Sequence, residues 1–309
     1  MLRTLSTLLI SLALGCAPAF AADSAADSAA SQQDEAAALM ASFKPQQGRV
    51  TLPGNIATLN LPASFRYLNP KDSARLLTEG WGNPPGGETL GMIIPADVSP
   101  LSAEGWGVVI TYDKDGHVKD DDASSIKYDE LLKDMQENTA SHNDERKKAG
   151  YPAMTLVGWA EPPRYDAGTH KLYWAQHLHS EGSKEDSLNY NIRVLGREGV
   201  LILNAVAGMD QIAGVKEEMK KVTAFTDFTD GNRYADFNSS TDKVAEYGIA
   251  ALIAGGAAAK LGLFGKLFAV LLAFKKVLFL AGAALVSFFW KLVGRKKEEN
   301  AAPPVDLSK

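Results

Sequence analysis

The stretch that decides the fold is residues 171–207, which read KLYWAQHLHSEGSKEDSLNYNIRVLGREGVLILNAVA. Three segments rich in apolar and β-branched residues, 171–179, 188–195 and 200–207, are separated by polar stretches, and a tight Arg-Glu-Gly turn at 197–199 joins the last two. Short strands joined by tight turns pair in the antiparallel sense. These residues therefore predict an antiparallel meander.

Further strands and a short helix are predicted upstream of this meander. The strands are expected over 50–53, 56–61, 89–94 and 105–112. Gly54-Asn55 is a hairpin signal between the first two strands, and Asp115-Gly116 is expected to turn the last one back as a hairpin. Asn69-Pro70 is typical of a helix cap and first helical residue, and this helix is expected to end near Glu79.

Two longer helices complete the predicted domain. The first spans 128–148, has Leu131, Leu132, Met135 and His142 near one face, and stops at Gly150. The second spans 210–222 and points Val215, Met219 and Val222 inward. The predicted fold class is α+β, a largely antiparallel sheet packed by at least two helices, with a C-terminal transmembrane helix.

Composition excludes several classes of protein. The chain has 309 residues, 46% of them hydrophobic and 22% charged, with one Cys and a net charge of −5. This is neither a disordered chain nor a disulfide-built one, and nucleic-acid binding is not expected. The charge is divided unevenly, because residues 4–247 carry 22 basic and 34 acidic side chains whereas 248–309 carry 9 and 3. An acidic body is joined to a basic, apolar tail.

The N-terminus has the pattern of a secretory signal peptide over 1–21. Arg3 precedes an apolar stretch from 5 to 17, and a small-residue cleavage site follows at Ala21 or Ala22. The apolar stretch is too short to span a bilayer. An alternative interpretation uses Cys16 as a lipidation site. If the signal is cleaved at the later site, the mature protein has no cysteine, which suits an oxidising compartment.

The C-terminal region predicts a membrane anchor. Residues 248–293 are almost wholly apolar but are interrupted by lysines, including the pair Lys275-Lys276. Centring that pair in a membrane would cost roughly 5 to 7 kcal/mol, so the expected span is 277–293. The basic cluster 295–297 then faces the cytoplasm, and the body lies in the periplasm, held at the bacterial inner membrane. The alternative is a hairpin of two spans that turns at the lysine pair.

The predicted organisation follows from these segments. It comprises a signal peptide (1–21), a low-complexity tether (22–47), a periplasmic α+β domain (48–237), a linker with a small-residue-rich apolar or interfacial helix (238–276), the transmembrane helix (277–293) and a basic cytoplasmic tail (294–309). Small residues at four-residue spacing, Gly255 with Ala259, allow close helix packing. The expected partners are the lipid bilayer and an envelope protein, or a second copy of the chain through this helix, with no nucleic acid.

Residues that could carry chemistry are few. The acidic segment 112–122 resembles a calcium loop only faintly, because Gly116 falls at the wrong position, and a solvated hairpin turn is the better interpretation. His177 and His179 share one face of a strand, as zinc ligands can, but a third ligand is missing nearby. Neither a nucleophile elbow nor a phosphate loop nor a metalloprotease motif occurs. No catalytic residue, metal site or cofactor is predicted.

Two similar segments are candidate binding loops. Residues 80–85 (GWGNPP) and 158–163 (GWAEPP) each place a Trp shortly before a pair of prolines, and each precedes an expected strand. Paired prolines stiffen the chain, and the indole offers a large ring for a partner. The plainer alternative is that each Trp anchors a rigid connection in the core. The candidate binding residues are Trp81, Pro84, Pro85, Trp159, Pro162 and Pro163.

Several motifs together resemble a family of bacterial, uncharacterised, membrane-anchored proteins whose domain has no assigned function. The resemblance covers nearly the whole mature chain and rests on residues 80–85, 105–107, 112–123, 128–132, 158–166, 234–237 and 243–256. It implies a signal peptide, an extracytoplasmic domain and a C-terminal membrane segment, and it implies no activity, cofactor or catalytic residue.

Three functional hypotheses follow. The first is a non-enzymatic envelope adaptor, sensor or scaffold, because a secretion signal and an anchor flank a body without catalytic motifs. The second is an anchored hydrolase-like enzyme with a spatially assembled site, in which His177 and His179 are the first residues to test. The third is a domain that binds a lipid, peptide or glycan through the two Trp-Pro-Pro segments, which would then have to line one surface.

Overall fold

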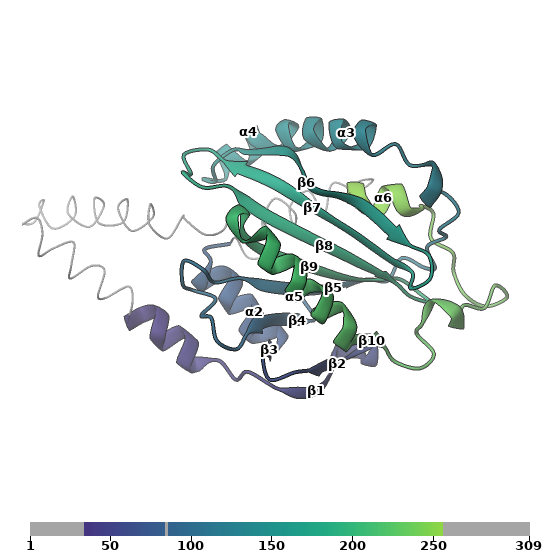
Figure 1. Ribbon diagram of the computed structural model, residues 1–309, viewed down its shortest axis with the longest axis horizontal. Helices are drawn as coiled ribbons and strands as arrows, with labels where there is room; N and C mark the ends of the chain where they lie inside the picture. The colour runs from purple at the N-terminus through teal and green to yellow at the C-terminus, as the bar shows by residue number, and fades with distance from the viewer. Residues whose placement is uncertain (1–33, 84–85, 256–309) are drawn as a thin grey trace, which may run out of the picture. The chain divides into compact units, whose positions relative to one another are not determined.

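The computed structural model describes residues 34–83 and 86–255 (Figure 1). The chain divides into two units, Met1–Ser42 and Phe43–Lys309. In the first unit, residues 34–42 are helical. All the elements that follow belong to the second unit.

A seven-stranded antiparallel sheet forms the centre of this unit, in the order β3-β4-β5-β9-β8-β7-β6. Its strands are β3 Phe65–Leu68, β4 Gly91–Pro95, β5 Gly107–Asp113, β6 Met154–Asp166, β7 Lys171–Ser180, β8 Ser187–Leu195 and β9 Val200–Gly208. A smaller antiparallel sheet has the order β1-β2-β10, with β1 Gly48–Thr51, β2 Ala57–Leu61 and β10 Thr226–Phe228.

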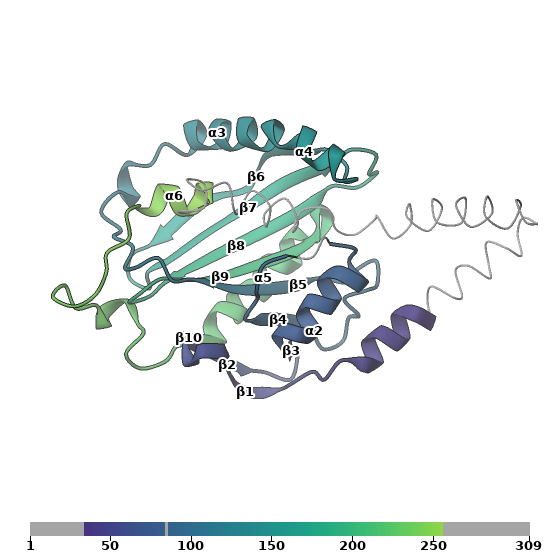
Figure 2. The ribbon, with the colours of Figure 1, turned by 180° about the vertical axis from the view of Figure 1, so that it is seen from behind.

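The helices cover both faces of the large sheet. They are α2 Pro70–Arg75, continued by a π-helical turn Leu76–Gly80, then α3 Tyr128–Ser141, α4 Asn143–Lys148, α5 Ile212–Phe225 and α6 Ile249–Ala254. Short 3₁₀ turns occur at Pro53–Asn55, Ala123–Ser125, Met209–Gln211 and Tyr234–Asp236. In Figure 1 α5 lies in front of β8 and β9, whereas Figure 2, from behind, shows α2 and α6 on the opposite side.

The core has a separate cluster on each face of the sheet. On the first face, Val215, Met219 and Val222 of α5 pack with the small sheet against alternate residues of β5, β8 and β9. On the second face, α6 and α3 pack on Leu172, Trp174, Leu195, Val200 and Ile202. This division follows from the two-residue period of strands, because neighbouring residues point to opposite faces.

The α+β class with a largely antiparallel sheet and several helices is confirmed. The meander β7-β8-β9, the β1-β2 hairpin and α5 occur where the sequence predicts them. Asn69 caps α2 by accepting a hydrogen bond from the Asp72 N–H, as expected. No helix within the described ranges is long and apolar enough to cross a membrane. The expected span 277–293 and the signal peptide 1–21 lie outside the described residues.

The single helix expected over 128–148 is wrong, because the chain breaks at His142. The His142 Nδ1 lies 2.7 Å from the Asn138 carbonyl, within the last turn of α3. After the break, the Asn143 side chain accepts a hydrogen bond from the Met154 N–H and donates one to the Met154 carbonyl. The break therefore allows α4 to pair its first residue with the start of β6.

The hairpin turn expected at Asp115-Gly116 is also wrong, because β5 pairs with β4 and β9 and the chain does not turn back on it. Gly116 instead has φ +112°, and a Cβ there would lie 2.8 Å from the Lys243 carbonyl oxygen. Only glycine combines this conformation with so close an approach. Residues 114–122 are thereby held against a segment more than 120 residues later in the chain.

Candidate functional site

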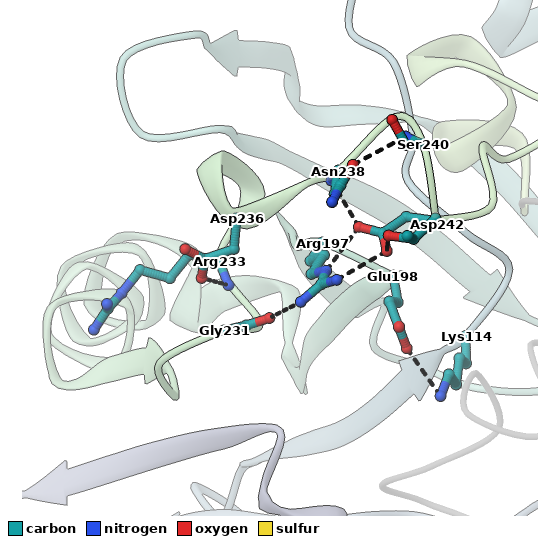
Figure 3. Close-up of polar contacts among 10 residues, drawn as sticks. Lys114, Arg197, Glu198, Gly231, Arg233, Asp236, Asn238, Ser240 and Asp242 are labelled. Atoms are coloured by element: carbon teal, nitrogen blue, oxygen red, sulfur yellow. Dashed lines mark hydrogen bonds and ion pairs between the residues drawn. The ribbon is translucent and has the colours of Figure 1, made fainter.

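The segment 229–254, here called the strap, follows β10 and is fastened to the turn between β8 and β9. Arg197 donates two hydrogen bonds to Asp242, from Nε at 2.7 Å and from Nη2 at 2.9 Å (Figure 3). The Asn238 N–H donates a third to the same carboxylate at 2.7 Å. The Arg197 hydrogen bond is the main reason why the pKa of Asp242 falls well below its usual range. The Asp242 side chain is 4% exposed, whereas the Arg197 side chain is 30% exposed, so the strap covers the carboxylate and leaves the guanidinium partly open to solvent.

The acidic segment 112–122 fastens the strap at several further places. The His117 N–H donates to the Lys243 carbonyl, and the Ala245 N–H donates to the His117 carbonyl. The Tyr247 hydroxyl donates to Asp115 at 2.8 Å. The two carboxylate oxygens of Asp122 accept hydrogen bonds from the first two N–H groups of α6. The segment is therefore an internal attachment and not the solvated turn that the sequence favoured.

Four aromatic rings stack where this segment meets the strap. Tyr234 lies between His170, at 3.9 Å between ring centroids, and His117, at 4.2 Å. Phe237 covers the other face of His117 at 3.9 Å. His170 holds a left-handed backbone conformation at φ +51°, which a non-glycine residue adopts at a cost. The stack joins the β6–β7 turn to the acidic segment and to the strap.

Asp120 is the polar centre of this stack. It accepts hydrogen bonds from the hydroxyls of Tyr165, at 2.7 Å, and Tyr234, at 3.2 Å. Burial raises the pKa of Asp120, but hydrogen bonds from the two tyrosines, with a backbone hydrogen bond and the nearby His170, together leave the pKa below its ordinary value. Burial, with Asp120 beside it, raises the pKa of Tyr234 to about 12 and that of Tyr165 further. The tyrosines stay protonated and donate to an ionised carboxylate, an arrangement that holds structure and leaves neither tyrosine as a nucleophile.

His117 is the buried histidine of the stack. Its side chain is almost fully buried, and its Nδ1 has no hydrogen-bond partner. Burial lowers the pKa of His117, although the backbone carbonyls of Gly196 and Arg197 act in the opposite direction. The ring is therefore held neutral where it stacks, and a proton on it would be unfavourable.

The predicted pair His177 and His179 is brought together with a carboxylate. Both rings lie on the first face of β7, where each contacts one oxygen of Asp186, His179 through Nδ1 at 2.8 Å and His177 through Nε2. The hydrogen bonds from His179 and then His177 lower the pKa of Asp186. Both carboxylate oxygens are already engaged. Within the described part of the chain, no group of three or more His, Cys, Asp or Glu side chains is arranged to hold a metal ion.

Trp81 and Trp159 lie near opposite edges of the large sheet. Trp81 follows the π-helical turn after α2, which packs against β4, and its indole N–H donates to the Pro100 carbonyl at 2.8 Å. Pro84 and Pro85 lie outside the described residues. Trp159 belongs to β6, the strand at the other edge. Trp81 and Trp159 therefore do not share a surface. Their role in binding stays a prediction, and it would concern two separate sites.

Residues 158–163 are part of a strand and not a loop. Pairing of β6 with β7 shifts register around Gly158, Glu161 and Arg164, so the strand bulges where Pro162 and Pro163 occur. A proline lacks an N–H group to donate, and an edge strand tolerates this loss at its open side. The Gln136 side chain donates to the Leu156 and Val157 carbonyls and covers the edge before the bulges. This motif has a structural use, which is to protect a sheet edge.

The structure also shows a set of buried polar residues that sequence reasoning missed. They lie on the second face of β7, β8 and β9, amid the apolar residues that α6 covers, and they comprise Gln176, Asn189, Asn191, Arg193 and Asn204. Arg193 stacks on Trp174 with its guanidinium carbon 4.8 Å from the ring centroid. Burial lowers the pKa of Arg193 to about 10, so it remains a cation at neutral pH. The pattern Asn-x-Asn-x-Arg at 189–193 taken alone is typical of a strand with one face in solvent, so it does not predict this burial.

Comparison with known proteins places the chain in a family without giving it an activity. The family model described as "Protein of unknown function (DUF2167)" matches residues 44–286. No curated protein matches the sequence.

Among solved structures, cyanobacterial PsbP (CyanoP) from Synechocystis sp. PCC 6803 is 13% identical with a TM-score of 0.33, over 60% of this chain and 94% of that one. The Saccharomyces cerevisiae Ran-binding protein Mog1p is 8% identical with a TM-score of 0.32, over 64% of this chain and 100% of that one. At these TM-scores, neither likeness supports an inference about this protein.

Proposed function

We propose that the chain, which belongs to the DUF2167 family of proteins of unknown function, is a membrane-anchored envelope adaptor or scaffold and not an enzyme. The observation that carries the proposal is the strap. It is fastened by the Arg197–Asp242 pair, by the backbone bonds of His117 and by the cap from Asp122. The folded unit is thus held together up to α6, which lies at the start of the apolar stretch 248–293. A folded body whose last described helix is fixed in this way suits a scaffold, because the expected anchor lies further along the same chain.

The electrostatics of the described clusters favour the same proposal. Asp120 accepts hydrogen bonds from two tyrosines that stay protonated, and each carboxylate oxygen of Asp186 is hydrogen-bonded to a histidine. Carboxylates engaged in this way stabilise an arrangement, whereas a general base needs a free acceptor within reach of a substrate proton.

The proposed membrane anchor and topology are supported by the sequence alone. We propose a cleaved signal peptide over 1–21, a single span over 277–293 and a periplasmic body, with the cluster 295–297 in the cytoplasm. Reporter fusions after Lys243 and after Lys297 test this topology. One span gives an outside signal and then an inside signal. Two outside signals would instead favour the hairpin, and inside signals from both fusions would refute export.

The adaptor hypothesis predicts a partner in the envelope or a second copy of the chain. In-cell crosslinking followed by purification of the full-length protein should recover a reproducible envelope protein or a crosslinked homodimer. A matched experiment with the signal peptide deleted controls for contacts made after cell lysis. Recovery of nothing above that control would count against an adaptor.

The cluster of His177, His179 and Asp186 favours a second candidate, an anchored hydrolase-like enzyme. A histidine oriented by a carboxylate is one component of nucleophilic and general-base sites. If the cluster is catalytic, His177→Gln and His179→Gln abolish any hydrolytic activity found for the full chain, whereas His142→Gln, on the α3–α4 junction, does not. Equal activity in all three variants would remove this candidate.

A further inference from the structure

The second face of the large sheet carries a group of buried polar atoms without partners. They are Gln176 Oε1, Trp174 Nε1 and both side-chain amide atoms of Asn189 and of Asn204. Asn189 is 1% exposed and Asn204 is 2% exposed. Buried polar groups in folded proteins are almost always hydrogen-bonded, so a set of this size requires an explanation.

The strand register makes these atoms one contiguous patch. Gln176 lies opposite Asn189, Trp174 lies opposite Asn191, and Asn191 lies opposite Asn204. The alternate residues of β8, such as Tyr190 and Ile192, belong to the core of the first face, so the amides point to the second. From Gln176 to Asn204 the patch crosses two strand spacings and two residues, a span of about 12 Å.

The patch is not explained by stability. A buried polar atom without a partner costs about 1–3 kcal/mol, and an apolar side chain at the same place avoids that cost. Leu172, Leu195 and Ile202 show that apolar residues fit on this face. The amides are therefore kept for a partner that supplies their hydrogen bonds.

The chemistry of the patch indicates what this partner is. The four side chains with unpartnered atoms are neutral, and each primary amide both donates and accepts. Arg193 already contacts the Asn191 side chain and the Trp174 ring. Hydroxyl groups, which also donate and accept, match such amides in either orientation. Val109 and Val206 border the patch on the β5 side and offer an apolar surface.

We propose that this patch, formed by Gln176, Asn189, Asn204 and Trp174, binds a neutral, hydroxyl-rich sugar of about two rings. Hydroxyls satisfy the amides, and the C–H faces of the rings pack on the bordering valines. Because Asn189 is 1% exposed and Asn204 is 2% exposed, binding requires local opening around the patch and association is slow. This site is independent of the adaptor hypothesis, because it needs neither an anchor nor a protein partner.

Titration of the full-length protein in detergent tests the proposal directly. The probes are the neutral disaccharides N,N′-diacetylchitobiose and cellobiose, with glucuronic acid and glucosamine as charged comparisons. In NMR spectra of the unsubstituted protein, the side-chain amide signals of Asn189, Asn204 and Gln176 shift with a neutral probe and not with a charged one. Absence of a shift with both neutral disaccharides overturns the proposal.

A double variant separates binding from folding. Asn189→Leu with Asn204→Leu weakens binding of the neutral probe at least tenfold, yet raises the melting temperature without the probe, because two unpartnered groups are removed. Asn60→Leu, at an exposed position of β2, is the matched control and leaves affinity unchanged. Unchanged affinity in the double variant overturns the proposal. So does a crystal structure in which only water, or residues after Gly255, bond the amides.

Discussion

Removal of the Asp122 carboxylate should loosen α6 selectively. The two oxygens of Asp122 accept the Ile249 N–H at 2.9 Å and the Ala250 N–H at 3.2 Å, so this residue caps the helix from a segment far away in the sequence. The helix has six residues and cannot be stable alone. Replacement of a capping carboxylate by Ala costs about 1–2 kcal/mol. If α6 opens locally, its exchange rate should rise about 5- to 30-fold.

Native-state hydrogen exchange on Asp122→Ala measures this effect amide by amide. Residues 249–254 should exchange faster, while the central strands β8 and β9 keep their protection. Asp121→Ala is the matched control, because Asp121 is the exposed neighbour in the same segment. Gly248→Ala should reproduce the effect, since a Cβ at Gly248 would lie 2.6–2.7 Å from the Asp122 carboxylate.

Two results would refute this reasoning. Unchanged exchange in α6 would show that the cap does not hold the helix, and the apolar contacts of Ile249, Leu252 and Ile253 would have to suffice. A uniform rise throughout the sheet would show that α6 opens only in global unfolding. Either result would weaken the strap as the connection on which the scaffold proposal rests.

Three further predictions concern the attachments of the strap and of the sheet edge. Burial lowers the pKa of His117, so below about pH 6.5 the unfolded chain binds a proton that the folded chain does not. The free energy of unfolding therefore falls as the pH drops from 7 to 5. Urea unfolding at several pH values should show a smaller fall for His117→Phe. Asp242→Asn should speed proteolysis within 231–245 and leave the two cores of the large sheet intact, because the carboxylate that Arg197 binds is lost. Equal cleavage of this variant and of the unsubstituted protein would contradict this. Gln136→Ala removes two hydrogen bonds to β6 and should cost about 1–3 kcal/mol by urea unfolding, with increased self-association in light scattering; a stable, monodisperse variant would contradict the proposed edge protection.

The sequence predicts those elements whose signals are local. The meander 171–207 combines apolar runs with tight turns, and α5 has its apolar residues at helical spacing, so both could be predicted. The strand β6 could not, because Gly158 and the prolines 162–163 are typical of loops. Its bulges and its position at the edge make those residues acceptable, and an edge position is a property of the whole sheet.

The attachments of the strap could not be predicted, because their partners are distant in sequence. Asp122 and Ile249 are 127 residues apart, and Tyr234 and Asp120 are 114 apart. A dense row of carboxylates at 112–122 has two ordinary interpretations, a calcium loop or a solvated turn. The third interpretation is a row of hydrogen-bond acceptors for the strap. It requires knowing that the strap packs against these carboxylates, and only the three-dimensional structure shows this.

The amide patch shows where alternation fails as a guide to burial. In β8, polar residues at 189, 191 and 193 alternate with apolar ones, as in a strand with one face in water. In β9, however, the sequence LILNAVA is apolar at both parities, which indicates a strand covered on both faces, and all of β9 is indeed buried. Asn204 within such a run must therefore be buried, and a buried amide requires a partner. Neighbouring strands belong to the same two faces of the sheet, so the polar residues of β8 that point the same way as Asn204 must be buried too. The signal that predicts their burial is therefore a single asparagine in an otherwise apolar strand.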